Sequence, residues 1–380
     1  MLMNTYAKPK LTFVKGDKCV VYTEDGDAYT DFTSGIGVSC LGYNNEGIGE
    51  AMASQVSLMH LSNLYNTKQD KILAQTLCEK TGLTNVFFGN SGAEANEGAI
   101  KIARKYSYDK YGEGRFEIIT LTNSFHGRTI TTLKATGQDA FHKYFLPFPD
   151  GFVYAAANDI ADVKSKISDK TCAIMIEFVQ GEGGVLPLDK QFVSEIKQLC
   201  EAQDILLIAD EVQTGVGRTG KFCAFMHYNV VPDVITLAKG LGGGIPIGAV
   251  ISGEKCKDTF GLSDHGSTFG GNPLCCCVAN SVMAQLTPQR LADVSANGEY
   301  FLAQLNSIDS KYIKAVRGIG LMIGVELVDI KNADVKDKCL EKGMLILTAG
   351  NNTLRFLPPL IITKADIDKL IEVLKQILDN

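Results

Sequence analysis

The chain contains 380 residues, of which 45% are hydrophobic and 21% are charged, and these proportions are typical of a globular protein with a large core. Its formal net charge is -6 at pH 7 and no basic stripe runs through it, which argues against nucleic acid as a partner. No apolar run reaches the length of a membrane span and the first residues lack an apolar signal core, so we expect neither a membrane anchor nor a secretion signal.

The 11 cysteines are scattered without the spacing of metal ligands. Cys275, Cys276 and Cys277 stand in a row, and three neighbouring thiols cannot converge on one metal ion, so we expect them to pack inside a helix. Free cysteines in this number are typical of a reducing compartment. The sequence therefore predicts a cytoplasmic protein without a metal site.

Short strands come first along the chain. Apolar and polar residues alternate over 11–34, and Asp25 and Gly26 fit the turn of a hairpin between two strands. Residues 46–80 follow with helical periodicity. Their apolar positions form two faces, one of Ile48, Met52 and Val56 and the other of Ile72, Leu73 and Leu77.

A buried strand that begins at Asn85 leads into a helix whose start is rich in small residues. Ser91 and Glu94 have the spacing of a capping box, in which each side chain accepts a backbone N–H of the first turn. Free N–H groups at a helix start attract anions. The segment fits either a phosphate site or an ordinary capped helix.

Two further apolar runs end in residues that carry chemistry. A strand from Glu117 ends in a loop with an aromatic, an imidazole and a guanidinium, namely Phe125, His126 and Arg128. A strand from Ile205 ends in Asp210 and Glu211. Open α/β sheets bind ligands at the carboxyl ends of their strands. The alternatives are a turn with a packed phenylalanine for the first loop and a helix cap for the carboxylates.

Lys239 closes an apolar run that starts at Val234, and a glycine-rich turn and a second apolar strand follow it. Burying an ammonium is costly unless the group is paired or used. A desolvated lysine beside a tight glycine turn suits a Schiff base with a carbonyl cofactor. The alternative is a lysine that extends from the strand end into solvent.

The C-terminal region changes character. After a polar, glycine-rich loop over 265–273, the chain alternates helices with short strands from about residue 285 onward, which is typical of a smaller α+β domain. The helices are expected over 291–305, 335–342 and 364–378, and the strands over 324–327, 344–347 and 354–356. The expected organisation is an N-terminal segment that joins the small domain, a large domain and a C-terminal small domain, over 1–45, 46–280 and 281–380.

Together these features resemble the class III (subgroup II) aminotransferases of fold type I, which use pyridoxal 5′-phosphate. The resemblance runs from Phe32 to Leu360 and is most specific where Asp210–Gly220 is followed by Lys239. It implies an α/β fold in which a large domain with a mostly parallel seven-stranded sheet adjoins a smaller α+β domain.

The resemblance also implies a role for each cofactor-binding residue. Lys239 is expected to form the Schiff base and to move the proton during transfer, and Asp210 is expected to keep the pyridine nitrogen protonated. The ring is expected to be held by Phe125 and Val212 on its faces and by Gln213 at its hydroxyl. The phosphate is expected to be held by Ser91, Gly92 and Ala93 and, from a second subunit, by Thr268, which implies a homodimer with shared active sites.

Substrate recognition follows from the same resemblance. Arg355 is expected to bind the α-carboxylate of glutamate and 2-oxoglutarate, and Glu182 to pair with it when an ω-amine occupies the site. Arg128 is expected to bind the distal carboxylate of the donor, helped by Ser267 of the facing subunit. The alternative for Arg128 is a structural salt bridge. His126 is expected to position its loop.

The implied reaction is ping-pong transfer of the ω-amino group of N-acetylornithine to 2-oxoglutarate, a step of arginine biosynthesis. Ile36 and His126 stand where ornithine aminotransferases have Tyr and Trp, which argues against free ornithine. The alternatives are 4-aminobutyrate, succinylornithine or ornithine as the donor, an aminomutase of the same fold, and a non-catalytic protein that binds a phosphate ligand. Two segments, Gly42–Glu46 and Glu177–Gln180, depart from the family pattern.

Overall fold

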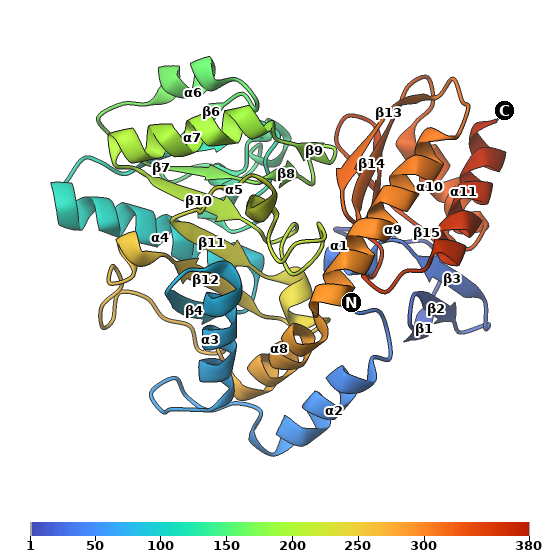
Figure 1. Cartoon of the computed structure of the whole chain (residues 1–380), viewed down its shortest axis with the longest axis horizontal. Coiled ribbons are helices and arrows are strands. Elements are labelled where there is room, and N and C mark those ends of the chain that lie inside the picture. Colours follow the sequence, from blue (N-terminus) through green and yellow to red (C-terminus); the bar gives the residue numbers. More distant parts are fainter. Residues whose placement is uncertain (1, 380) are drawn as a thin grey trace.

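The structure, a computed structural model, describes residues 2–379. A seven-stranded sheet with the order β4-β12-β11-β10-β7-β5-β6 lies on the left side of Figure 1. Strand β12 is antiparallel to both of its neighbours, and the other strands pair in parallel. The prediction of a mostly parallel seven-stranded sheet is confirmed. Its strands are β4 (Asn85–Gly89), β5 (Glu117–Leu121), β6 (Phe152–Ala155), β7 (Thr171–Ile176), β10 (Leu206–Asp210), β11 (Val234–Leu237) and β12 (Gly248–Ser252).

Both faces of this sheet are covered by helices, which is why its strands are continuous apolar runs. Alternate residues point to opposite faces. Ile208 packs in a cluster with Ile100 of α4, whereas Leu207 packs in a cluster with Ile196 of α7. The helices of this part are α2 (Glu46–Gln55), α3 (Gln69–Thr81), α4 (Gly92–Tyr111), α5 (Ile130–Ala135), α6 (Ile160–Lys166), α7 (Lys190–Gln203) and α8 (Pro273–Gln285).

The N-terminal strands share a sheet with a C-terminal strand. Its order is β1-β2-β3-β15, and β3 pairs in parallel with β15. The predicted hairpin around Asp25 and Gly26 lies between β2 and β3, and β1 adds a strand that the alternation had merged with β2. The strands are β1 (Phe13–Asp17), β2 (Val20–Thr23), β3 (Ala28–Asp31) and β15 (Met344–Leu345). The domain boundaries at 45 and 280 stay a prediction.

The C-terminal helices were predicted to within a few residues. They are α9 (Pro288–Asn306), α10 (Asn332–Glu341) and α11 (Lys364–Leu378). A second sheet has the order β13-β14-β17-β16, and its first strand was not predicted. Its strands are β13 (Ile313–Ile319), β14 (Met322–Leu327), β16 (Leu347–Ala349) and β17 (Thr353–Phe356). The remaining short elements are α1 (Ser34–Gly37), β8 (Val179–Gln180) and β9 (Leu186–Pro187).

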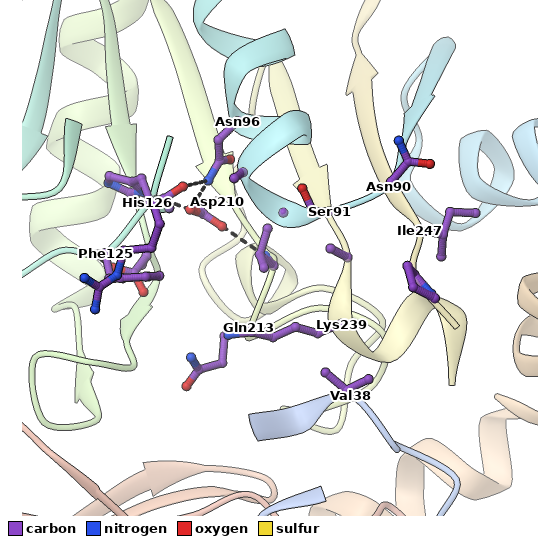
Figure 2. A pocket seen from close by; sticks show the side chains of 18 of the residues that line it. Val38, Asn90, Ser91, Asn96, Phe125, His126, Asp210, Gln213, Lys239 and Ile247 are labelled. Atoms are coloured by element: carbon purple, nitrogen blue, oxygen red, sulfur yellow. Dashed lines mark hydrogen bonds and ion pairs between the residues drawn. The ribbon is translucent and has the colours of Figure 1, made fainter. Parts of the chain in front are cut away.

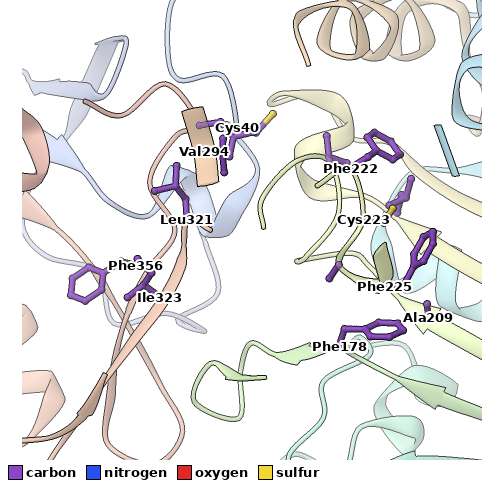
Figure 3. Close-up of a cluster of buried hydrophobic side chains, with 14 of the residues drawn as sticks. Cys40, Phe178, Ala209, Phe222, Cys223, Phe225, Val294, Leu321, Ile323 and Phe356 are labelled. Atoms are coloured by element: carbon purple, nitrogen blue, oxygen red, sulfur yellow. The ribbon is translucent and has the colours of Figure 1, made fainter. Parts of the chain in front are cut away.

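A single hydrophobic cluster extends from the large sheet into the C-terminal part. Figure 3 shows Phe178 and Phe225 on the side of β10, and Leu321 and Phe356 on the side of the second sheet. Cys275 and Cys276 are buried in α8, which confirms that the cysteine run packs in a helix. Because the large sheet and the C-terminal part pack on one hydrophobic core, the loops that face each other between them keep a fixed relative position.

Residues 2–379 contain neither a membrane-spanning helix nor a cluster of metal ligands. None of the helices there combines the length and the apolar character that crossing a bilayer requires. Over the same range, no three His, Cys, Asp or Glu side chains form a group that could bind a metal ion.

Candidate active site

A cavity of about 440 Å³ lies at the carboxyl edge of the large sheet (Figure 2). It is lined from the end of β10 by Asp210, from the turn after β11 by Lys239, and from the start of α4 by Ser91. The loop after β5 contributes Phe125 and Arg128. Segments that are far apart in the sequence therefore meet where an open α/β sheet binds its ligand.

Lys239 lies at the start of a short 3-10 helix (Lys239–Gly242) and has a φ of 43°, a left-handed conformation that is uncommon for a residue with a side chain. Its side chain lines the cavity, so the alternative of a lysine extending into solvent is wrong. Burial lowers the pKa of its amine to about 8, an effect that Glu182 opposes and Arg355 reinforces. About a tenth of the amine is therefore uncharged and nucleophilic at pH 7, a far larger fraction than for a lysine of ordinary pKa.

Asp210 is 3% exposed, and its carboxylate is held in place from several sides. Oδ2 accepts a hydrogen bond of 2.8 Å from Asn96 Nδ2 and lies 2.7 Å from Nδ1 of His126. Oδ1 accepts 3.0 Å from the backbone N–H of Val212. His126 therefore touches Asp210 directly, which goes beyond the loop-positioning role that we predicted for it.

Asn96 and Glu177 are site residues that the sequence reasoning missed. Asn96 Nδ2 also donates to the carbonyl of His126 at 2.7 Å, so this amide joins α4 to the loop after β5. Its signal in the sequence was an asparagine on the apolar face of a helix, a position that requires buried hydrogen-bond partners. Glu177 accepts 2.8 Å from Phe125 N and 3.3 Å from Gly181 N, and burial raises its pKa to about 7.

The start of α4 has the structure of an anion site. Ser91 Oγ accepts 3.2 Å from Glu94 N, so Ser91 caps the helix as predicted. The Glu94 carboxylate accepts from Asn90 N and not from Ser91 N, so the reciprocal half of the predicted capping box is displaced by one residue. A Cβ at Gly92 would lie 2.6 Å from Cγ1 of Val212, so only glycine lets the helix start approach this wall of the cavity. The first N–H groups of the helix, which have no partner within it, are then available to an anion.

Arg355 is buried on β17 and already has a carboxylate partner. Its Nη1 donates 2.6 Å to Oε1 of Glu182 and 3.2 Å to Oε1 of Gln213, which lines the cavity. Burial alone would raise the pKa of Glu182, but the charge of Arg355 and its hydrogen bond outweigh burial and lower it. The predicted contact between Glu182 and Arg355 is present in the structure. Neither residue lines the cavity, but Gln213, which accepts a hydrogen bond from Arg355, does.

Arg128 contrasts with Arg355, because none of residues 2–379 forms an ion pair with it. Its guanidinium lies 4.0 Å from the ring centroid of Phe141 and 5.6 Å from that of Phe125. The alternative of a structural salt bridge within the described chain is therefore wrong. The arginine is free to bind an anion at the cavity.

Ser267 and Thr268 do not line the cavity of their own chain. Thr268 is exposed, and Ser267 Oγ accepts 3.2 Å from Asn90 and 2.9 Å from Gly270 N. Ile36 is also outside the cavity and 41% exposed, whereas Val38 lines it. The roles that we predicted for Ser267 and Thr268 require a second copy of the chain.

Comparison with known proteins gives a consistent picture. The family Aminotransferase class-III matches residues 2–378. The acetylornithine aminotransferase of Haemophilus ducreyi is 50% identical over 100% of this chain and 96% of its own length, and that of Methanocaldococcus jannaschii is 47% identical over 99% of this chain and 95% of its own.

Solved structures show the same fold. The N-acetylornithine aminotransferase of Stenotrophomonas maltophilia aligns with a TM-score of 0.86 at 33% identity, over 97% of this chain and 95% of its own. The ornithine aminotransferase of Toxoplasma gondii aligns with a TM-score of 0.94 at 31% identity, over 99% of this chain and 91% of its own. Because relatives with different donors share the fold, the donor has to be inferred from individual side chains.

Proposed function

The chain belongs to the class-III aminotransferases, and we propose on that premise that it transfers the ω-amino group of N-acetylornithine to 2-oxoglutarate, giving N-acetylglutamate semialdehyde and glutamate. It is a pyridoxal-phosphate-dependent transaminase of fold type I, and the reaction is a step of arginine biosynthesis. The observation that carries the substrate proposal is the contrast between two arginines. Arg355 is paired with Glu182, and Arg128 has no ion-pair partner among the described residues.

The cavity fits pyridoxal phosphate, because it contains a lysine amine without a hydrogen-bond partner among residues 2–379, a fixed carboxylate and a free helix start. When bound, the cofactor supplies an electron-withdrawing ring that stabilises negative charge on the carbon bearing the amine. Lys239 would hold its carbonyl carbon and Asp210 its ring nitrogen. Ser91, Gly92 and Ala93 would hold the phosphate, with Phe125, Val212 and Gln213 around the ring.

Lys239 is suited to move protons within this site. An amine with a pKa of about 8 can accept a proton and return it near neutral pH, which a lysine of ordinary pKa does poorly. The 2.7 Å contact between His126 and Asp210 fixes the carboxylate opposite the ring nitrogen in this proposal. In this proposal Lys239 moves the proton, and Asp210 holds a negative charge beside the ring nitrogen.

The two arginines account for two half-reactions at one site. A donor that brings an ω-amine has no carboxylate near that amine, so Glu182 continues to neutralise Arg355, while Arg128 binds the distant carboxylate. Glutamate brings an α-carboxylate, which replaces Glu182 on Arg355. The side chain of Glu182 is 27% exposed and therefore has room to leave the pair.

We also propose a homodimer with shared active sites. Met52, Val56, Leu64 and Phe269 expose large apolar side chains at 39%, 62%, 88% and 61%. Asn63 Nδ2 donates 2.8 Å to the carbonyl of Ser267, so this apolar surface adjoins the loop that carries Ser267 and Thr268. A second copy that covered the surface would deliver this loop to the facing cavity.

The proposed location is the cytoplasm. All 11 cysteines lie within the described residues as free thiols, and burial raises the pKa of many of them, including those of Cys40 to about 11 and Cys172 to about 12. Free thiols in this number suit a reducing compartment.

A steady-state assay tests the reaction class. We expect the holoenzyme to convert N-acetylornithine only when 2-oxoglutarate is present, and to form glutamate in equal amount. An aminomutase would turn the donor over without the acceptor, and a non-catalytic binding protein would form no glutamate with either mixture.

A further inference from the structure

Arg128 lies at the cavity with an aromatic ring as its closest support. The Cζ atom of its guanidinium is 4.0 Å from the ring centroid of Phe141, and its next aromatic neighbour, Phe125, is 5.6 Å away. Arg128 is itself exposed, and no carboxylate among residues 2–379 pairs with it. The ring of Phe141 is therefore the contact that decides where this guanidinium lies.

Phe141 is held firmly enough to act as such a support. Its ring packs edge-on against Phe125 with centroids 6.1 Å apart and planes at 78°. The next residue, His142, has its Nε2 2.8 Å from the carbonyl of Leu133 and 2.9 Å from that of Thr136, which ties the segment to the C-terminal end of α5. Phe141 is thus connected both to Phe125, which lines the cavity, and to the end of α5.

We propose that Phe141 is a positioning residue for substrate specificity, whose ring holds the Arg128 guanidinium ready to bind the distal carboxylate of the donor. The proposal rests on the function proposed above and deepens it. A long arginine side chain loses much rotamer freedom when it binds a carboxylate in the bidentate geometry. A ring that already restricts it reduces that loss, so Phe141 contributes to binding without touching the donor.

The experiment separates the carboxylate from the rest of the donor. N-acetylornithine and N-acetyl-1,4-diaminobutane differ only by the carboxylate, so the ratio of their kcat/KM values measures what that group contributes. We expect Phe141→Leu to lower the ratio by about 5- to 10-fold, through a higher KM for N-acetylornithine at unchanged kcat. The decarboxylated donor should react as with the original enzyme, and Phe141→Tyr, which keeps a ring, should retain the original ratio.

A double variant tests whether Phe141 acts through Arg128. Arg128→Gln should abolish most of the discrimination, and adding Phe141→Leu to it should lower the ratio no further. The proposal is overturned if Phe141→Leu leaves the ratio unchanged, if it slows both donors equally, or if its effect persists in the Arg128→Gln background. If the unaltered enzyme prefers another ω-amino acid, that acid and its decarboxylated amine replace the pair, and the proposed function fails while the role of Phe141 is still decided.

Discussion

At the scale of single residues, the site depends on how burial and nearby charges change otherwise ordinary side chains. Lys239 has a pKa of about 8 because burial disfavours its ammonium form, whereas Asp210 is surrounded by donors from Asn96, His126 and Val212. The amine and the carboxylate can therefore take different roles within one cavity.

The pKa of Lys239 leads to a pH-dependence that can be measured. The uncharged amine is the nucleophile, and raising the pH through about 8 removes its proton, so the rate at which apoenzyme captures pyridoxal phosphate covalently should rise up to that pH and then level off. A lysine with the ordinary value of 10.5 would make the rate rise well beyond pH 9. Stopped-flow absorbance measures the rate at each pH.

Free N-acetyl-lysine is the matched control for this titration, because it experiences the same ionisations of the cofactor without the protein. Parallel pH profiles for the enzyme and for N-acetyl-lysine would contradict the account of Lys239. The Lys239→Ala variant should show no covalent capture at any pH.

Many site residues were predictable because they stand at the ends of apolar strands. The other site residues have no such position in the sequence pattern. Asp210, Phe125 and Lys239 each follow an apolar run, so sheet geometry alone places them at one edge. Asn96 lies inside a helix, and Phe141 belongs to a segment without periodicity, so only the tertiary structure brings them to the site. Contacts between side chains of different elements are not encoded in local pattern.

At the scale of elements, the buried strands were the most predictable part. Their apolar runs are continuous, since both faces are covered by helices. β13 was missed because its residues include Lys314, Arg317 and Gly318, a polar pattern for a strand. Two contacts explain its place, since Arg317 donates 2.7 Å to Glu326 and 2.8 Å to the carbonyl of Gly184.

One departure from the family pattern has a structural use in this chain. In the segment Gly42–Glu46, Tyr43 donates 2.7 Å from its hydroxyl to Asp31, and Asn45 caps α2 by accepting 3.0 Å from Ile48 N. The segment therefore joins the N-terminal sheet to α2.

At the scale of the whole molecule, the described chain supplies most of one site but not all that we propose for it. Thr268 lies outside its own cavity, and the apolar surface of Met52, Val56 and Leu64 is uncovered. A dimer would resolve both features at once.

Hybrid dimers test the shared site. Lys239→Ala and Thr268→Glu chains should each be inactive alone, the second because a carboxylate repels the phosphate. After mixing and subunit exchange, half of the dimers are hybrids with one intact site, so about a quarter of the original activity should return. A mixture of Lys239→Ala with Asp210→Ala, two changes on the same side of the site, should recover none, and equal recovery in both mixtures would contradict shared sites.

The proposed donor can be tested most directly by single-turnover kinetics with holoenzyme. Each of N-acetylornithine, succinylornithine, ornithine and 4-aminobutyrate is mixed with the enzyme without an acceptor, and the absorbance of the cofactor is followed. Free ornithine would bring a second ammonium beside Arg128, where none of residues 2–379 offers an ion-pair partner to neutralise it. We predict that N-acetylornithine reacts with a kcat/KM at least about tenfold above those of ornithine and 4-aminobutyrate. An equal or higher value for either of those two donors would contradict the account.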